Sequence, residues 1–202
     1  MRAPEEEADL CVVADWLAAN GLQAARFSPA ERKTGKTPDF RVYRGDQHVA
    51  FCEVKSPRDD WLDDQLAVAE PFQIVGGLRA DPTFNRISGH IAKAAKQFDA
   101  VNPGRKLPNI LVFVNWADAN SFQDLHETLT GYLELEGGGR ITTMPNVAEG
   151  RLIGERKHHI DMYAWLDGRS RRLQGHVFSR TNTAFVAEIC SWLGLDMARI
   201  RE

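Results

Sequence analysis

The fold is decided by residues 38–55, which read PDFRVYRGDQHVAFCEVK. Residues 39–44 and 49–54 are rich in aromatic and β-branched side chains, and the connection at residues 45–47 is short and turn-prone. The two segments are therefore expected to form an antiparallel β-hairpin. The second segment is apolar as far as Glu53, and a carboxylate at that position requires a partner, because burying an unpaired charge is costly.

Three polar side chains of this hairpin are expected to lie close together. Asp39 opens the first strand, and Glu53 and Lys55 end the second. Residues two apart in a strand project from the same face, so Glu53 and Lys55 share a face beside which the hairpin places Asp39. Two carboxylates at short range repel each other unless a cation lies between them.

This arrangement predicts a magnesium site. Mg²⁺ prefers oxygen ligands, typically one or two carboxylates with water and substrate phosphate, and the carbonyl of Val54 is a further candidate ligand. Such a metal polarises a phosphate and generates hydroxide from bound water. Lys55 would orient that water or stabilise the charge that builds up in the transition state. The predicted chemistry is therefore hydrolysis of a phosphodiester bond.

The rest of the chain predicts alternating helices and strands. Residues 109–116 form a continuous apolar run, which is typical of a central strand covered on both faces. Apolar spacing and end signals predict helices over residues 4–20, 60–70, 82–100, 121–130 and 183–193, and further strands over residues 24–27, 159–166 and 173–178. Residues 28–37 and 137–139 are expected to be loops or turns. The order predicts one α/β domain, residues 1–202, with a mixed sheet flanked by helices on both faces.

The spacing of Asp39, Glu53 and Lys55, with a proline before the first acid, resembles the core motif of the PD-(D/E)XK, or restriction-endonuclease-like, nuclease superfamily. The resemblance implies that Asp39 and Glu53 bind Mg²⁺ or Mn²⁺ and that Lys55 serves catalysis. It also implies a core of αβββαβ order, which the predicted elements match from about residue 4 to residue 116. Residues 117–202 would then be a C-terminal αβ elaboration.

Two further sites follow from the resemblance. Many members of the superfamily carry a glutamine or lysine on the helix after the motif, and Lys93 and Gln97 lie four residues apart on one face of the predicted helix 82–100. Some members carry a glutamate on the first helix as an additional metal ligand. Glu6 and Glu7 are both candidates for that role, since they lie four and three residues before Leu10, on the inward side of the expected helix.

The charge composition of the chain limits how it could bind nucleic acid. The 202-residue chain has a formal net charge of −3 and a pI near 6.1, so nucleic acid would bind through local basic patches. DNA is the expected substrate, and association with a second copy or a partner protein is left open. The chain lacks an apolar run long enough to cross a membrane, and its acidic N-terminus is not expected to be a secretory signal. Its three cysteines are widely spaced and are expected to be reduced and buried in a cytoplasmic protein.

Two alternatives remain open. The first is a catalytically inactive member of the same fold that serves as a binding or assembly module, because fold does not determine function. The second is a nuclease that acts on RNA. His90 suits either packing or a contact with phosphate, whereas His158 and His159 are expected to be structural or surface residues. Trp61 is a candidate for contact with a base, although it also suits the start of a helix. The sequence does not distinguish endonucleolytic from exonucleolytic cutting.

Overall fold

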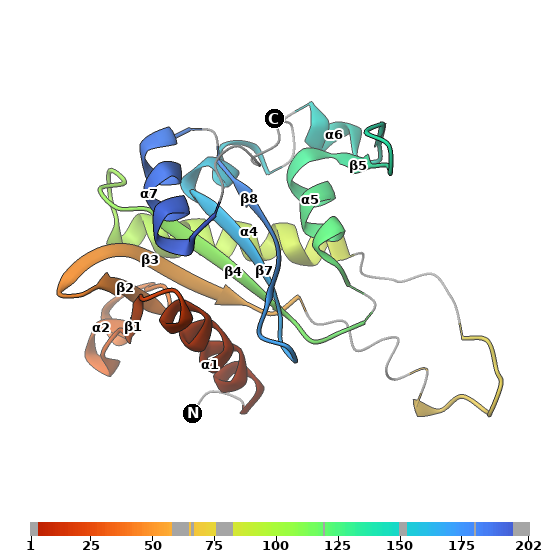
Figure 1. Ribbon diagram of the computed structural model, residues 1–202, viewed down its shortest axis with the longest axis horizontal. Coiled ribbons are helices and arrows are strands. Elements are labelled where there is room, and N and C mark those ends of the chain that lie inside the picture. The colour runs from red at the N-terminus through yellow and green to blue at the C-terminus, as the bar shows by residue number, and fades with distance from the viewer. Residues whose placement is uncertain are drawn as a thin grey trace.

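The structure is a computed structural model that describes residues 4–57, 65, 67–75, 83–118, 120–149, 153–179 and 181–195. A six-stranded sheet in the order β1-β2-β3-β4-β7-β8 forms its centre (Figure 1). The strands are β1 (Gln23–Arg26), β2 (Phe40–Arg44), β3 (Gln47–Lys55), β4 (Asn109–Asn115), β7 (Met162–Asp167) and β8 (Leu173–Phe178). β3, β4 and β7 run parallel, and the other neighbours pair antiparallel. The predicted α/β class with a mixed sheet is confirmed.

Helices cover both faces of this sheet (Figure 1). α1 (Pro4–Ala19) and α7 (Thr183–Leu193) pack on one face, and α4 (Thr83–Val101) and α5 (Phe122–Thr130) pack on the other. The smaller elements are α2 (Pro29–Thr34), β5 (Tyr132–Glu134), β6 (Arg140–Thr142), α6 (Pro145–Ala148) and the 3₁₀ helix η1 (Gly154–His159). Because helices pack on both faces, the sheet separates two apolar clusters, one beneath each helical layer.

In the ranges that the structure describes, no helix is long and apolar enough to cross a membrane.

The alternation of side chains along β3 determines from which face of the sheet its polar residues project. Phe51 packs in the cluster beneath α4, whereas Cys52 and Val54 pack in the cluster beneath α1. Glu53 and Lys55 alternate with those two residues, so they project toward α4. The hairpin and the shared face of Glu53 and Lys55 are therefore confirmed.

The loop predicted over residues 28–37 is wrong in its first part, because α2 begins there. The Ser28 side chain accepts a hydrogen bond from the Glu31 backbone N–H, and the Glu31 carboxylate accepts one from the Ser28 N–H. This capping box, with Pro29 at the start of the helix, satisfies the backbone donors of a short helix. Pro29 and Gly35 are typical loop residues, and for this reason the capping box of Ser28 and Glu31 was not recognised in the sequence.

The strand predicted from residue 159 also needs correction. It begins only at Met162, because residues 154–159 form η1, and Ile160 packs on the α4 face, whereas a strand that included it would place it on the same face as Met162. The predicted turn at residues 137–139 joins β5 and β6 in a small hairpin that the sequence pattern did not predict. Hydrophobic periodicity therefore gave the wrong secondary structure for several segments that lie outside the main sheet.

Apolar neighbours in the sequence do not by themselves predict whether a cysteine is buried. Cys52 and Cys190 are buried, as predicted, whereas the prediction is wrong for Cys11, which is exposed on α1. Successive helical residues lie about 100° apart around the axis, so an apolar neighbour does not ensure burial. All three cysteines are free.

Some predictions lie outside the described residues. The helix expected over residues 60–70 falls mostly there, and Trp61 and the helix start expected at residues 81–82 fall there completely. The other predicted helices and the strands of the main sheet, apart from the start of β7, have the observed bounds to within two residues at each end that the structure describes.

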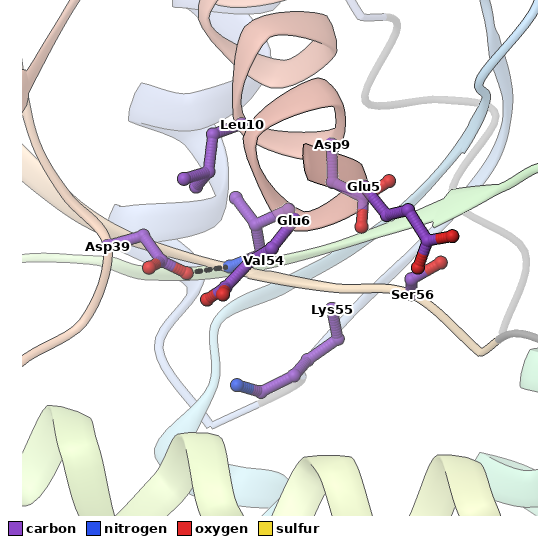
Figure 2. Close-up of a pocket in the computed structure, with 8 residues that line it drawn as sticks. All are labelled: Glu5, Glu6, Asp9, Leu10, Asp39, Val54, Lys55 and Ser56. Carbon is purple, nitrogen blue, oxygen red and sulfur yellow. Dashed lines mark hydrogen bonds between the residues drawn. The ribbon is translucent and has the colours of Figure 1, made fainter. Parts of the chain in front are cut away.

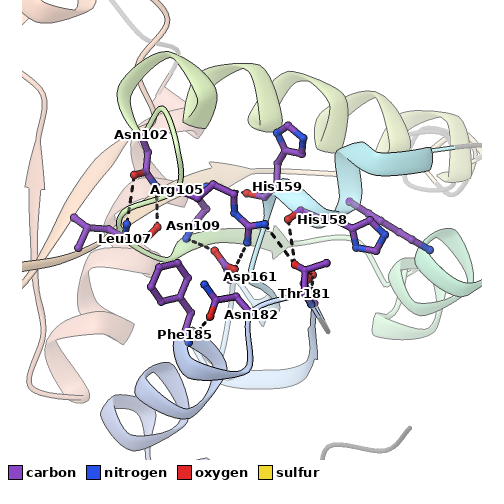
Figure 3. Close-up of polar contacts among 12 residues, drawn as sticks. Asn102, Arg105, Leu107, Asn109, His158, His159, Asp161, Thr181, Asn182 and Phe185 are labelled. Carbon is purple, nitrogen blue, oxygen red and sulfur yellow. Dashed lines mark hydrogen bonds and ion pairs between the residues drawn. The ribbon is translucent and has the colours of Figure 1, made fainter.

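A buried polar network fixes the amino ends of β4 and β7 (Figure 3). Asp161 is fully buried and accepts hydrogen bonds from the backbone N–H of Asn109, at 2.9 Å, and from Arg105. Burial raises the pKa of Asp161, and the Asn109 N–H and the Arg105 cation offset part of this rise. The backbone carbonyls of His158 and His159 join the network, at the end of the sheet opposite to the hairpin acids. The network holds the strands in register and is structural.

Candidate active site

The carboxyl end of β3 gathers the hairpin residues. Asp39 directly precedes β2, and the β2–β3 register pairs Phe40 with Cys52, which brings Asp39 level with Glu53. The backbone N–H of Val54 donates a hydrogen bond of 3.0 Å to Asp39 Oδ2 (Figure 2). This bond holds Asp39 against the strand that carries the other acid, as the hairpin geometry predicted.

Glu53 is a buried carboxylate with an incomplete set of partners. Its side chain is 1% exposed, and its Oε1 accepts a hydrogen bond from the Lys55 ammonium. Its Oε2 is buried and has no hydrogen-bond partner among the residues that the structure describes. Burial, and then the charge of Asp39, raise the pKa of Glu53 to about 8, and the Lys55 ammonium and the Gln97 amide oppose this rise. Such a carboxylate is costly to ionise unless a cation binds it.

α4 supplies the other polar groups that face β3. The Gln97 amide nitrogen donates a hydrogen bond of 2.9 Å to the carbonyl of Thr37, in the segment that leads to Asp39. Gln97 thereby ties α4 to that segment, and its amide lies near Glu53. Lys93 lies one helical turn earlier and is exposed. The structure therefore brings Gln97 to the acids, whereas Lys93 extends into solvent.

A pocket of about 250 Å³ opens between α1 and the end of β3 (Figure 2). Figure 2 shows the carboxylates of Asp39 and Glu6 pointing toward one another beside Val54. The pocket is lined by Glu5, Glu6, Asp9, Leu10, Asp39, Val54, Lys55 and Ser56. Acids from the first turns of α1 thus face the acid of the hairpin.

The structure distinguishes between Glu6 and Glu7, the two candidates for an additional metal ligand on α1. Glu6 lines the pocket, whereas Glu7 forms an ion pair of 2.8 Å with Arg26 and is not a lining residue. Sequence reasoning missed Glu5 and Asp9, which also line the pocket. Their signal was a spacing of four residues, which places both on one face of α1.

Asp9 joins α1 to the end of β4. The Trp116 indole N–H donates a hydrogen bond of 2.6 Å to Asp9 Oδ1, and Asp9 is buried. Trp116 packs against Gly168, where a Cβ would lie 2.5 Å from the indole ring. This side of the pocket therefore depends on the absence of a side chain at residue 168.

Gly168→Ala is expected to lower the free energy of unfolding by about 1–3 kcal/mol, because the added methyl group must displace the Trp116 ring. Urea unfolding of the variant and the wild type measures the change. Gly35→Ala is the matched control, since a Cβ at Gly35 meets no atom within 4 Å and the backbone there is extended. Equal stability of Gly168→Ala and the wild type would contradict this packing of Trp116.

His90 lies beside the end of β3 on α4. Its ring packs edge-on against Phe113, with 6.3 Å between the ring centres, and it contacts the backbone of Ser56. Burial, and then the positive charges of three neighbouring side chains, lower its pKa to about 4, so the imidazole is neutral at neutral pH. His90 therefore packs against the sheet and also faces the polar end of β3.

The donor set suits a hard divalent cation. Asp39 and Glu53 lie together at the end of β3, and Glu53 offers a buried oxygen without a partner in the described part of the chain. No three His, Cys, Asp or Glu side chains in the described ranges form a metal cluster on their own. Mg²⁺ does not require one, because one or two carboxylates with water and substrate phosphate commonly hold it.

The comparisons with known proteins identify no relative. No family model matches the chain, and searches of the curated proteins and of the solved structures found no match. The function proposed for the protein therefore depends on the geometry and electrostatics of the site.

Proposed function

We propose that the protein is a metal-dependent nuclease of the PD-(D/E)XK type that hydrolyses phosphodiester bonds, with DNA as its substrate. The observation that carries the proposal is the state of Glu53. This buried acid has a raised pKa and an oxygen with no partner among the described residues. Ionisation of Glu53 is expected to destabilise the metal-free fold, whereas a bound divalent cation would stabilise the ionised form.

The two hairpin acids are the proposed metal ligands. Asp39 and Glu53 would hold Mg²⁺ or Mn²⁺, with the carbonyl of Val54 as a further ligand. Glu6 faces Asp39 from α1 in the pocket, which Glu53 does not line, and is the proposed additional acid on the Asp39 side. When bound, the metal polarises the substrate phosphate and lowers the pKa of a coordinated water.

Lys55 and Gln97 have separate proposed roles. The Lys55 ammonium lies at Glu53, where it is placed to donate a hydrogen bond to a phosphate oxygen as negative charge develops, or to orient the attacking water. The Gln97 amide is fixed by the carbonyl of Thr37 and lies near Glu53. Gln97 would therefore position Glu53 or the attacking water rather than take part in bond making.

The order of the elements supports the same proposal. α1, β1, β2, β3, α4 and β4 follow the αβββαβ order of the restriction-endonuclease-like core, with α2 inserted between β1 and β2. Asp39 precedes the second strand of that order, and Glu53 lies in the third. β7, β8 and α7 extend the sheet and one helical layer beyond this core.

Cleavage of matched DNA and RNA tests the proposal. The purified protein is expected to cut duplex DNA with Mg²⁺ or Mn²⁺, to lose this activity in EDTA, and to cut RNA more slowly. Asp39→Asn is expected to abolish cleavage and to weaken the binding of Mn²⁺ measured by calorimetry. Glu7→Gln is the matched control, because Glu7 pairs with Arg26 and does not line the pocket.

Each alternative has its own outcome in this experiment. Faster cleavage of RNA than of DNA would make the protein a ribonuclease. Cleavage that persists in EDTA or in Asp39→Asn would reject the metal mechanism. A wild-type protein that neither cuts nucleic acid nor binds Mn²⁺ would reject the nuclease and favour the inactive binding or assembly module.

A further inference from the structure

α4 carries a row of polar side chains, only one of which the proposed catalytic centre uses. The α4 row consists of Arg86, His90, Lys93 and Gln97. Their spacing of four, three and four residues places them within about 60° of one another around the helix axis. The buried face of α4 is a different stripe, which contains Ile87, Ile91, Ala94 and Phe98.

The α4 row begins at the hairpin acids and leads away from them. Gln97 lies near Glu53, and His90 contacts the backbone of Ser56, so α4 runs antiparallel to the end of β3. Arg86 lies one turn further along and therefore beyond the last residue of β3. The helix rises about 16 Å from one end of the row to the other.

The row is positively charged and faces Lys55. After burial, the charges of Lys55, Lys93 and Arg86 lower the pKa of His90, because these cations surround the imidazole on one side of α4. Lys93 is exposed, and no acidic side chain in the described ranges lies at ion-pair distance from it.

The end of β3 thus lies between acids on α1 and cations on α4. The acids suit a metal ion, but they repel a polyanion. The net charge of −3 gives the chain no overall attraction for nucleic acid, so local cations must provide it. Arg86 and Lys93 are separated by about 10 Å of helix. A ligand with regularly repeated negative charge suits such a row, and in B-DNA a phosphate recurs about every 3.4 Å of axis on each strand.

We propose that Arg86 and Lys93 form a phosphate-binding track along which the DNA backbone runs into the catalytic centre. Each of the two cations would neutralise a phosphate, and His90 between them, whose one N–H is donated to the backbone of Ser56, would hold this part of α4 against the end of β3. The track rests on the proposed nuclease function for its substrate, but DNA binding by the track can be measured without cleavage.

Binding of a fluorescent DNA duplex in EDTA tests the track. Lys93→Ala is expected to weaken binding about three- to tenfold and to reduce the slope of log K against log [KCl] by about 0.9, the value for one lost phosphate contact. Lys93→Glu is expected to act in the same direction with a larger effect. Lys96→Ala is the matched control, because Lys96 is an exposed lysine of the same helix that lies about 90° from the middle of the row, on the side away from His90. It is expected to keep the wild-type affinity and salt slope.

The outcomes separate the track from the nuclease. Wild-type affinity and salt slope in both Lys93 variants, or no DNA binding by the wild type, would overturn the track whether or not the protein cuts DNA. Binding that depends on Lys93 without any cleavage would support the track and reject the nuclease. Displacement of DNA by polyglutamate as readily as by unlabelled DNA would assign the row to an acidic protein and overturn the track. Circular dichroism checks that each variant is folded.

Discussion

Lys55→Ala is expected to reduce the rate of Mg²⁺-dependent DNA cleavage roughly a hundred- to a thousandfold. The Lys55 ammonium lies at the Glu53 carboxylate, on the face of β3 that α4 covers. Without it, charge that develops on the phosphate in the transition state would lose its nearest cationic side chain, whereas the proposed metal ligands Asp39 and Glu53 stay in place. Single-turnover cleavage rates at saturating Mg²⁺ measure the loss.

Two controls separate catalysis from metal binding and from folding. Binding of Mn²⁺, measured by calorimetry, is expected to survive in Lys55→Ala, because Asp39 and Glu53 are intact. Lys96→Ala removes a lysine from the exposed face of α4 and is expected to cut DNA at the wild-type rate. A cleavage rate in Lys55→Ala within about threefold of the wild type would exclude Lys55 from transition-state stabilisation and reject the assigned mechanism.

Glu53→Gln is expected to stabilise the metal-free protein at alkaline pH while it abolishes cleavage. Burial and the Asp39 charge raise the pKa of Glu53 from 4.5 to about 8, so the folded protein binds this proton more tightly than the unfolded chain does. Between about pH 5 and about pH 8, the wild type therefore loses stability as the pH rises, by at most about 1.4 kcal/mol per pH unit. The glutamine variant has no proton to lose at this position. The free energy of unfolding of Glu53→Gln is expected to exceed that of the wild type by an amount that increases across the same pH window and reaches about 2–4 kcal/mol near pH 8.

Urea unfolding in EDTA across this pH window measures the difference. Glu7→Gln is the matched control, since Glu7 is an exposed acid paired with Arg26, and its stability is expected to follow that of the wild type at every pH. At alkaline pH, added Mg²⁺ is expected to stabilise the wild type but not Glu53→Gln. Parallel stability curves for Glu53→Gln and the wild type would mean that Glu53 ionises as a solvated acid does, and the basis for the metal site would be lost.

Most elements could be predicted because their signals are local. α7 and β8 have the predicted bounds, and β4 differs by one residue, since each is defined by apolar spacing within its own segment. The error at α2 was also local, because the capping box of Ser28 and Glu31 was present in the sequence. The position of Ile160 was not a local property, since it depends on η1 packing against α4.

The candidate site could be predicted only in part. Hairpin pairing and the two-residue period of a strand were sufficient to place Asp39 beside Glu53. They could not decide between Glu6 and Glu7, because the rotation of α1 about its axis is set by how its apolar residues pack on the sheet. The hydrogen bond from Trp116 to Asp9 joins residues 107 apart in the chain, and no pattern in the sequence indicates it.

The sequence by itself determined which residues of β3 share a face and where most of the helices and strands lie along the chain, because the periods of strands and helices are properties of a few adjacent residues. The tertiary structure alone decided the chemical state of Glu53. Exclusion of water and a nearby negative charge each raise the pKa of a carboxylate, and here α4 and the segment at Asp39 contribute both at Glu53. The approach of the α4 row to Lys55 has the same origin, since it results from packing between a helix and a strand that are well separated in the chain.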